Sequence, residues 1–567
     1  MFGGEKMLID QVKQTKFEQK TYEDWQEVAV QSLRGLPFEK LVAKTIEGID
    51  LFPLYTSASP KLQSLQAIRQ AQRENGWVVA QQQYTTDATV FLQNLRVSLE
   101  RGNEAIVYDG TNPIEWDEAT LKELHEYVLQ YPVYFLKVSK KDKIVHLFNE
   151  IANENRQNVV GVVELEETSM LKDFPHIRTI SADVVDAHHK GADAVTELAL
   201  ILAEAAEQAE KLGDFKTVSE QLFVRMAIDT HFFMEIAKIR AFRVLWEALS
   251  HAYEEPTEHI PVLSETSKRS YSTLDPYVNL LRAGNSAFSA ILGGTDVLTV
   301  HPHNVLTEPN ATSIRLARNI QLVIKEETEV NGILDPSGGS YFIEALTKEL
   351  VEKAWVLFID IDAAGGYSHY ISSSEYEERL NKCYESRLAD LAKGKHSLVG
   401  TSVYADLTSD EKIEPVVAVD GRLAAPFENF RQRFKKAQPK VGLVTFGLLK
   451  DFKPRADFVS GFLATGGIET ISSPELATVT EALDWLQQEN IDYAIICATN
   501  ERTLEVVPQL LQNKAAHYVV DVAGKYDAEL SNEWLDAGLN GFIYMGLNKL
   551  EKFAEIEQQM KGDDVHA

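Results

Sequence analysis

Two pairs of histidines are the residues of this 567-residue sequence whose type and spacing suggest chemistry first. His301 and His303 flank a proline after the apolar run 297–300, and two imidazoles at that spacing could ligate a metal ion. No third ligand follows nearby in the sequence, so an ordinary loop is the simpler interpretation. His188 and His189 open a helical pattern, where we expect solvent-facing or interface positions rather than catalysis.

The two cysteines do not form a metal or disulfide motif. Cys383 and Cys497 are far apart in the sequence and lack the spacing of a zinc site. Cys497 lies in an apolar run, and we expect it to be a small buried core residue. No Walker, G-x-G-x-x-G or G-x-S-x-G pattern is present. We therefore predict no catalytic residue and no metal site from local motifs.

Length and charge limit the classes of protein to which the chain could belong. A chain of 567 residues suggests two to four domains. The net charge of −29 and the pI near 5.0 argue against binding to nucleic acids or anionic membranes. No apolar run reaches the roughly 18 residues that a membrane span needs, and no secretory signal is visible. The simplest location is the cytoplasm.

Short apolar runs alternate with helical patterns through residues 41–364, after a polar, partly helical N-terminal arm at 1–40. We expect the arm either to pack on the rest of the chain or to bind a partner. Strands are predicted near 103–108, 132–138, 159–164 and 179–183, and helices near 90–100, 191–211, 238–249 and 286–292. Parallel βα units over such a length favour a (β/α)8 TIM-type barrel.

The C-terminal part, residues 437–567, follows a second α/β pattern. Five strands are predicted to start near Val441, Glu469, Tyr493, His517 and Gly541, with helices between and after them. The first of these helices is predicted over 455–464, after a loop. This pattern predicts a doubly wound, flavodoxin-like sheet. Residues 365–436 fit neither pattern, and we expect an interdomain connector that packs on surfaces.

Six blocks in order resemble the methylmalonyl-CoA mutase family. They span roughly 300 residues and precede the flavodoxin-like part, which makes the resemblance specific. The blocks are Thr45–Thr56, Glu235–Trp246, Asn279–Arg282 with Leu292–Thr295, Ser313–Leu322, Glu326–Glu327 and Asp335–Glu344. The resemblance implies a TIM barrel followed by a cobalamin-binding-like domain. It also implies an enzyme complex that interconverts (R)-methylmalonyl-CoA and succinyl-CoA with adenosylcobalamin.

The cobalamin loop of the family departs from its pattern in this sequence. Catalytic members carry Asp-x-His-x-x-Gly, in which the His binds cobalt and the Asp orients the His. Counting from Gly447, Leu449 stands at the Asp position, Asp451 at the His position and Pro454 at the Gly position. The later Gly-Gly of the family, beside the cofactor's nucleotide tail, is replaced by about Asp521-Val522. We therefore expect a degenerate loop and no cofactor on this chain.

The barrel positions that the family uses for catalysis differ as well. Where catalytic members have a Tyr-His pair, the alignment places Val185 and Asp186. A second family Tyr follows Trp-x-x-Arg-Gln, whereas this chain has Trp77-Val-Val-Ala-Gln-Gln-Gln83. The scaffold blocks are present while these functional positions are lost. The chain therefore resembles the small, non-catalytic subunit of the heterodimeric enzymes of this family.

The resemblance implies a large catalytic subunit as partner, which would bind both the adenosylcobalamin and the acyl-CoA. Two alternatives stay open at the sequence level. The chain could be an independently active acyl-CoA mutase that binds cobalamin without a protein His. It could also be a binding module that senses cobalamin or CoA esters for another enzyme.

Overall fold

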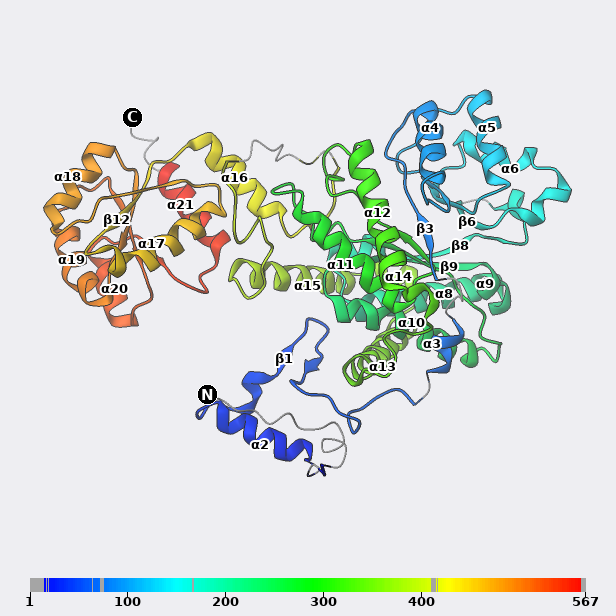
Figure 1. Ribbon diagram of the computed structural model, residues 1–567, viewed down its shortest axis with the longest axis horizontal. Coiled ribbons are helices and arrows are strands. Elements are labelled where there is room, and N and C mark those ends of the chain that lie inside the picture. Colours follow the sequence, from blue (N-terminus) through cyan, green and yellow to red (C-terminus); the bar gives the residue numbers. More distant parts are fainter. Residues whose placement is uncertain are drawn as a thin grey trace.

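The structure is a computed structural model that describes residues 15, 16, 18, 20–63, 65–71, 76–165, 168–408, 415 and 417–561. The first part of the predicted N-terminal arm lies outside these residues. Two α/β units stand on opposite sides of Figure 1, with the connector helices between them and the arm below. Among the described helices, none is both long enough and apolar enough to cross a membrane.

The larger unit is a ring of parallel strands. One sheet has the order β4-β5-β6-β7 and the other has the order β3-β11-β10-β9-β8. Their bounds are β3 (Val78–Ala80), β4 (Ile106–Asp109), β5 (Val133–Val138), β6 (Gly161–Leu165), β7 (Ile177–Arg178), β8 (Ile180–Asp183), β9 (Leu222–Ile228), β10 (Val262–Thr266) and β11 (Val297–Thr299).

The two sheets join at both ends, which closes the ring. β7 and β8 are successive halves of one strand, of which the first pairs with β6 and the second with β9. At the other end, Gln82 forms a parallel bridge with Val107, and the Glu104 amide donates to the Val79 carbonyl at 2.8 Å. The ring therefore has eight strand positions, and the predicted (β/α)8 architecture is confirmed.

Helices surround this ring, and the apolar patterns of the sequence predict where they pack. The helix predicted over 191–211 is α8, whose N-cap Asp193 accepts from the Thr196 amide. It is buried on most of its surface because it packs between α10 and α13. The helices are α3 (Gln66–Gln70), α4 (Ala88–Leu99), α5 (Glu118–Val128), α6 (Leu147–Glu150), α7 (Val185–Lys190), α8 (Ala194–Leu212), α9 (Phe215–Gln221), α10 (Phe232–Ala252), α11 (Val278–Gly293), α12 (Ala311–Thr328) and α13 (Tyr341–Ala363).

The described part of the arm contains little buried surface. α2 (Tyr22–Ser32) starts at a Thr21 capping box and has no buried residue. Just after the arm, β1 (Ala43–Lys44) and β2 (Asp50–Leu51) form a short antiparallel pair. The helical character predicted for the arm is confirmed in α2.

The connector contains α14 (Tyr367–Ile371), α15 (Ser374–Ala392) and α16 (Ala425–Ala437). α16 does more than pack on a surface, because its Phe427, Phe430 and Phe434 are buried in one core with β12 and β14. Its Glu428 also reaches the barrel unit, where the carboxylate accepts from the Thr273 amide at 2.8 Å. α16 therefore ties the two units together (Figure 1).

The smaller unit is a five-stranded parallel sheet in the order β13-β12-β14-β15-β16. This is the flavodoxin-like order 2-1-3-4-5, as predicted. Its strands are β12 (Val441–Thr445), β13 (Thr470–Ser472), β14 (Tyr493–Cys497), β15 (Val519–Ala523) and β16 (Gly541–Ile543). Its helices are α17 (Leu449–Ala464), α18 (Val479–Glu489), α19 (Asn500–Asn513), α20 (Ala528–Asp536) and α21 (Lys549–Lys561).

One boundary of this unit was predicted wrongly. α17 begins at Leu449 and not at Arg455, so the expected loop at 448–454 is largely helical. Pro454 misled the prediction because proline usually marks a loop. Pro454 lies in the second turn of α17, close to the start of the helix. Its missing amide N–H costs the helix one hydrogen bond there.

Candidate functional site: the barrel mouth and the C-terminal loop

A cavity of about 790 Å³ opens at the carboxyl ends of the barrel strands. Active sites of TIM barrels lie at this end. Residues from most strands and one stretch of the connector, 417–420, line it. The lining residues used below are Gln82, Tyr84, Asp109, Lys137, Val185, Asp186, His189, Arg225, Glu265, Lys268 and His301.

Tyr84, His301 and Glu265 form a hydrogen-bonded row in this cavity. The Tyr84 hydroxyl lies 2.7 Å from His301 Nδ1, and His301 Nε2 lies 3.1 Å from Glu265 Oε1. Burial lowers the pKa of His301, so its imidazole is neutral near pH 7. Burial alone would raise the pKa of Glu265, but the Lys268 charge and the His301 hydrogen bond hold it well below its ordinary value. A neutral imidazole between a hydroxyl and a carboxylate can relay a proton.

Ion pairs occupy most of the charges beside this row. Arg225 on β9 lies 2.6 Å from Asp183 and 3.1 Å from Glu265. Lys137 on β5 lies 2.9 Å from Asp186 on α7. These charges are therefore largely neutralised by one another, and the mouth has no strong excess of either sign.

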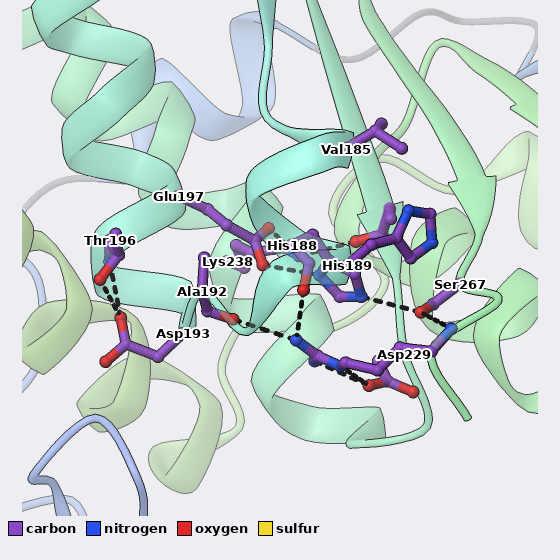
Figure 2. A network of polar contacts seen from close by, with 12 residues as sticks. Val185, His188, His189, Ala192, Asp193, Thr196, Glu197, Asp229, Lys238 and Ser267 are labelled. Carbon is purple, nitrogen blue, oxygen red and sulfur yellow. Dashed lines mark hydrogen bonds and ion pairs between the residues drawn. The ribbon is translucent and has the colours of Figure 1, made fainter. Parts of the chain in front are cut away.

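A second polar network lies behind the mouth and is almost completely buried. Figure 2 shows His188 between Glu197 of α8 and Ser267 of the loop after β10. Its Nδ1 lies 2.7 Å from Glu197 and its Nε2 lies 2.8 Å from the Ser267 hydroxyl. Lys238 of α10 binds Glu197 and Glu235, each at 2.7 Å. Burial lowers the pKa of His188 well below its ordinary value.

The prediction that His188 and His189 face solvent or an interface was wrong. The side chain of His188 is fully buried, and His189 is 7% exposed. α7 is covered by α15 of the connector, whose Arg387 donates to the Gly191 carbonyl. Arg269 closes the same region by donating to the His188 carbonyl at 2.9 Å. This cover comes from distant parts of the sequence, so no local pattern could have shown it.

His301 and His303 do not share a site. His301 lies in the mouth cavity, after the carboxyl end of β11. His303 turns away and stacks on Tyr277, with ring centroids 5.0 Å apart. In the described ranges of the chain, no three His, Cys, Asp or Glu residues gather as metal ligands would.

Sequence reasoning missed Tyr84, Arg225 and Glu265. Each lies in a barrel strand or just after it, at the carboxyl end of the ring. A usable signal existed for Arg225, which is a charged residue within the otherwise apolar run Leu222–Ile228. Cys497, by contrast, is fully buried in β14, as predicted.

In the C-terminal unit, Gly447 and the start of α17 hold the four residues singled out in the sequence. Gly447 follows β12 with φ of +95°, a conformation that favours glycine. Leu449 is the first residue of α17 and is 55% exposed. Asp451 accepts from the Leu448 amide at 3.2 Å, as a helix cap does. Pro454 lies inside the helix.

A buried charge cluster lies on the face of the same sheet. Asp521 of β15 is fully buried and binds Lys552 of α21 at 2.5 Å, and it also accepts from the Tyr493 hydroxyl at 2.5 Å. A side chain at Gly541 would bring its Cβ within 2.8 Å of Lys552 Nζ. The space between β15, β16 and α21 is therefore filled.

Comparison with known proteins identifies the family. A family model described as methylmalonyl-CoA mutase matches residues 159–439. The methylmalonyl-CoA mutase small subunit of Porphyromonas gingivalis is 26% identical over 605 residues, covering 95% of this chain and 97% of that protein. The probable methylmalonyl-CoA mutase small subunit of Mycobacterium bovis is 33% identical over 362 residues, covering 59% of this chain and 57% of that protein.

The chain belongs to the methylmalonyl-CoA mutase family. A further relative, the methylmalonyl-CoA mutase of Cereibacter sphaeroides, is 34% identical over 294 residues, covering 49% of this chain and 41% of that protein. The family consists of isomerases that depend on cobalamin.

In this mutase-family barrel, the positions that the sequence alignment singled out meet at one place. Gln82, Gln83, Val185 and Asp186 all line the mouth cavity. Figure 2 shows Val185 pointing away from the buried His188 network. Asp186 is engaged by Lys137, and Val185 has no polar group. Val185 and Asp186 cannot supply a Tyr-His pair, although both line this cavity.

The residues present do not fit cobalamin in this mutase-family chain. Asp451 is held as a helix cap, so its carboxylate is directed at the Leu448 amide. A carboxylate is also a poor substitute for imidazole on cobalt. Lys552 and Asp521 fill the space beside Gly541. We therefore derive no step through cobalamin on this chain.

Proposed function

We propose that the chain is the small, non-catalytic subunit of a heterodimeric methylmalonyl-CoA mutase. The complete enzyme would interconvert (R)-methylmalonyl-CoA and succinyl-CoA with adenosylcobalamin. Both the cofactor and the acyl-CoA would be bound by the large subunit. The chain itself would stabilise that subunit and would be inactive alone.

The start of α17 is the single observation that carries this proposal. The helix begins directly after Gly447 and Leu448, and Asp451 caps it. A cobalt-binding His on a loop has no place in that arrangement. The mouth of the barrel supports the same conclusion, because Asp186, which the sequence comparison predicts at the position of a catalytic group, is paired with Lys137.

The partner and the location are part of the proposal. The names of the relatives in Porphyromonas gingivalis and Mycobacterium bovis describe small subunits, which supports a large subunit as partner. We place the complex in the cytoplasm. The division into an arm (1–40), a barrel (41–364), a connector (365–436) and a C-terminal domain (437–567) likewise stays a prediction.

A visible-absorption titration tests the proposal. Adenosylcobalamin is added to the purified chain alone and then to its complex with the large subunit of the same organism, and mutase turnover is assayed in both. We expect no spectral shift and no turnover with the chain alone, and both with the complex. A base-off spectral shift or turnover from the isolated chain would support an independently active mutase instead.

The mouth cavity favours one second function, which is binding of a CoA ester as a signal. A volume of about 790 Å³ lies within the range of small-molecule sites, and Tyr84, His301 and Lys268 offer polar contacts. Isothermal titration of the isolated chain with methylmalonyl-CoA and succinyl-CoA tests this function. Saturable heat that is lost in a Tyr84→Phe, His301→Leu double variant would support it, and no heat would exclude it.

A further inference from the structure

A second cavity, of about 240 Å³, lies beside the start of α11 and outside the barrel mouth. It is formed by the loop that leads into α11 and by the loop after β11. Its lining residues are Ser272, Thr273, Pro276, His303, Asn304, Leu306, Thr307 and Glu308.

Two buried polar atoms in this lining have no hydrogen-bond partner among the described residues. They are His303 Nδ1 and Asn304 Oδ1. The side-chain nitrogen of Asn304 donates to the Glu308 backbone carbonyl at 2.7 Å. This bond identifies the unpartnered side-chain atom of Asn304 as its oxygen, which can only accept a hydrogen bond. Burial lowers the pKa of His303, so its ring is neutral near pH 7, and in the tautomer with the proton on Nε2 its Nδ1 is an acceptor. The cavity therefore lacks a donor.

Large side chains are exposed at the start of α11 and in the connector, whose Thr401 hydroxyl donates to Ser272 of the cavity lining at 2.7 Å. Tyr277 stacks on His303 at an interplanar angle of 22° and is 65% exposed. Leu281, one helical turn further along α11, is 74% exposed. Tyr404 of the connector is 86% exposed and has φ of +52°, a strained conformation for a residue with a side chain.

The connector segment with Tyr404 is joined to α11. Arg282 donates to the Val399 carbonyl at 2.7 Å, and Val399 and Val403 form a bridge that precedes Tyr404. Exposed tyrosines around a cavity are typical of binding hot spots between proteins, because their rings lose water on association. We call Tyr277, Leu281 and Tyr404 the α11 patch.

The charge of the cavity indicates which donor would enter it. Glu308 is the one charged residue among the lining residues, and it is acidic. Two acceptors beside a carboxylate suit an ammonium or guanidinium group better than a neutral amide. The strongly acidic chain, with a net charge of −29, adds to this preference.

We propose that the α11 patch docks the large mutase subunit, which inserts a Lys or Arg side chain into the cavity between His303 and Asn304. This inference rests on the proposed function, because it names the surface through which that heterodimer forms. The rings of Tyr277 and Tyr404 flank the inserted side chain, and its head group donates to the two unpartnered acceptors.

The binding affinity of the large subunit for variants of this chain tests the inference. A Tyr277→Ser, Leu281→Ser double variant removes the patch, and we expect it to weaken binding by about a hundredfold. His303→Phe keeps the ring stacked on Tyr277 but removes Nδ1, and we expect a loss of about tenfold. Leu504→Ser on α19 is the matched control, since Leu504 is also exposed, and we expect wild-type affinity.

The outcomes separate the inference from the function on which it rests. If the wild-type chain does not bind the large subunit, the proposed function fails. If the wild type binds and both patch variants bind equally well, the α11 patch is not the interface. If only His303→Phe binds like the wild type, the cavity holds nothing but water and the inserted cation is wrong.

A crosslinking experiment covers the case in which a variant does not fold. A photoreactive phenylalanine derivative at position 277 leaves the rest of the chain unchanged. We expect it to crosslink to the large subunit, within a few residues of a Lys or Arg. Crosslinks only within the same chain would overturn the proposal.

Discussion

Asp451 serves the fold as a helix cap, at a position where the sequence comparison predicts that catalytic relatives carry a cobalt-binding His. Its carboxylate accepts from the Leu448 amide and lies close to Gly447. Capping of this kind satisfies an amide at the start of α17 that would otherwise lack a partner. The same atoms cannot also face a ligand above the sheet.

Replacement of the cap tests this residue-scale role. We expect Asp451→Ala to lower the free energy of unfolding of the C-terminal unit by about 1 kcal/mol. Asp451→Asn is the control, because its amide oxygen can still accept from the Leu448 amide. The free energy of unfolding should therefore decrease clearly less in this variant. Urea denaturation followed by tryptophan fluorescence gives both values. Equal losses in the two variants would contradict the capping role.

His189 is expected to make stability depend on pH. Burial, together with the charge of Lys268, lowers its pKa to about 3 from an ordinary value of 6.5. The unfolded chain therefore takes up a proton below pH 6.5 that the folded chain refuses, so stability is lost as the pH falls toward 3. His188 acts in the same direction, since burial also lowers its pKa.

Urea denaturation at pH 7 and pH 5 measures this dependence. In the wild type, the free energy of unfolding should fall between pH 7 and pH 5. A His189→Gln variant removes one of the responsible groups, so this fall should be smaller by on the order of 2 kcal/mol. His176→Gln, at an exposed position, should leave the loss unchanged. If the free energy of unfolding of the His189 variant falls with pH as steeply as in the wild type, this ring titrates normally in the folded chain.

At the scale of elements, apolar runs predicted β4, β5, β6 and β8 of the barrel and the five strands of the smaller unit. β5 is the clearest case, because Val133–Val138 is a largely apolar run whose side chains are mostly buried. The start of α17 and the burial of His188 could not be predicted, because a cap and a covering helix decided them. Tertiary contacts across many residues determined these two points.

A buried ion pair within the connector supports one of its contacts with the barrel. Arg422 binds Glu428 through both nitrogens, and Glu428 also accepts from the Thr273 amide of the barrel unit. Removal of one partner leaves a buried charge without compensation, which commonly costs about 3–5 kcal/mol.

A Glu428→Leu variant should therefore release α16 from the barrel. We expect limited proteolysis to cut the connector near Arg422 much faster than in the wild type. Glu557→Leu, which removes a partly exposed partner of Arg433, is the control and should be cut at the wild-type rate. Unchanged cutting in the Glu428 variant would mean that other contacts hold the two units together.

At the scale of the whole molecule, the chain keeps the architecture of the mutase family. The site could be predicted only in part. The sequence predicted that Val185, Asp186 and the loop after Gly447 differ from the catalytic pattern, and the structure brings the first two into one cavity. The row of Tyr84, His301 and Glu265 could not be predicted, since its three residues come from three distant strand ends.

The most direct test asks which chain supplies the nitrogen that binds cobalt. Histidine labelled with nitrogen-15 is incorporated into either the large subunit or this chain, and the complex is assembled with cobalamin and reduced to the cobalt(II) state. Electron paramagnetic resonance then records the nitrogen splitting of the cobalt signal. The account predicts that the splitting changes only when the large subunit carries the label. A change caused by label in this chain would place a cobalt ligand here and contradict it.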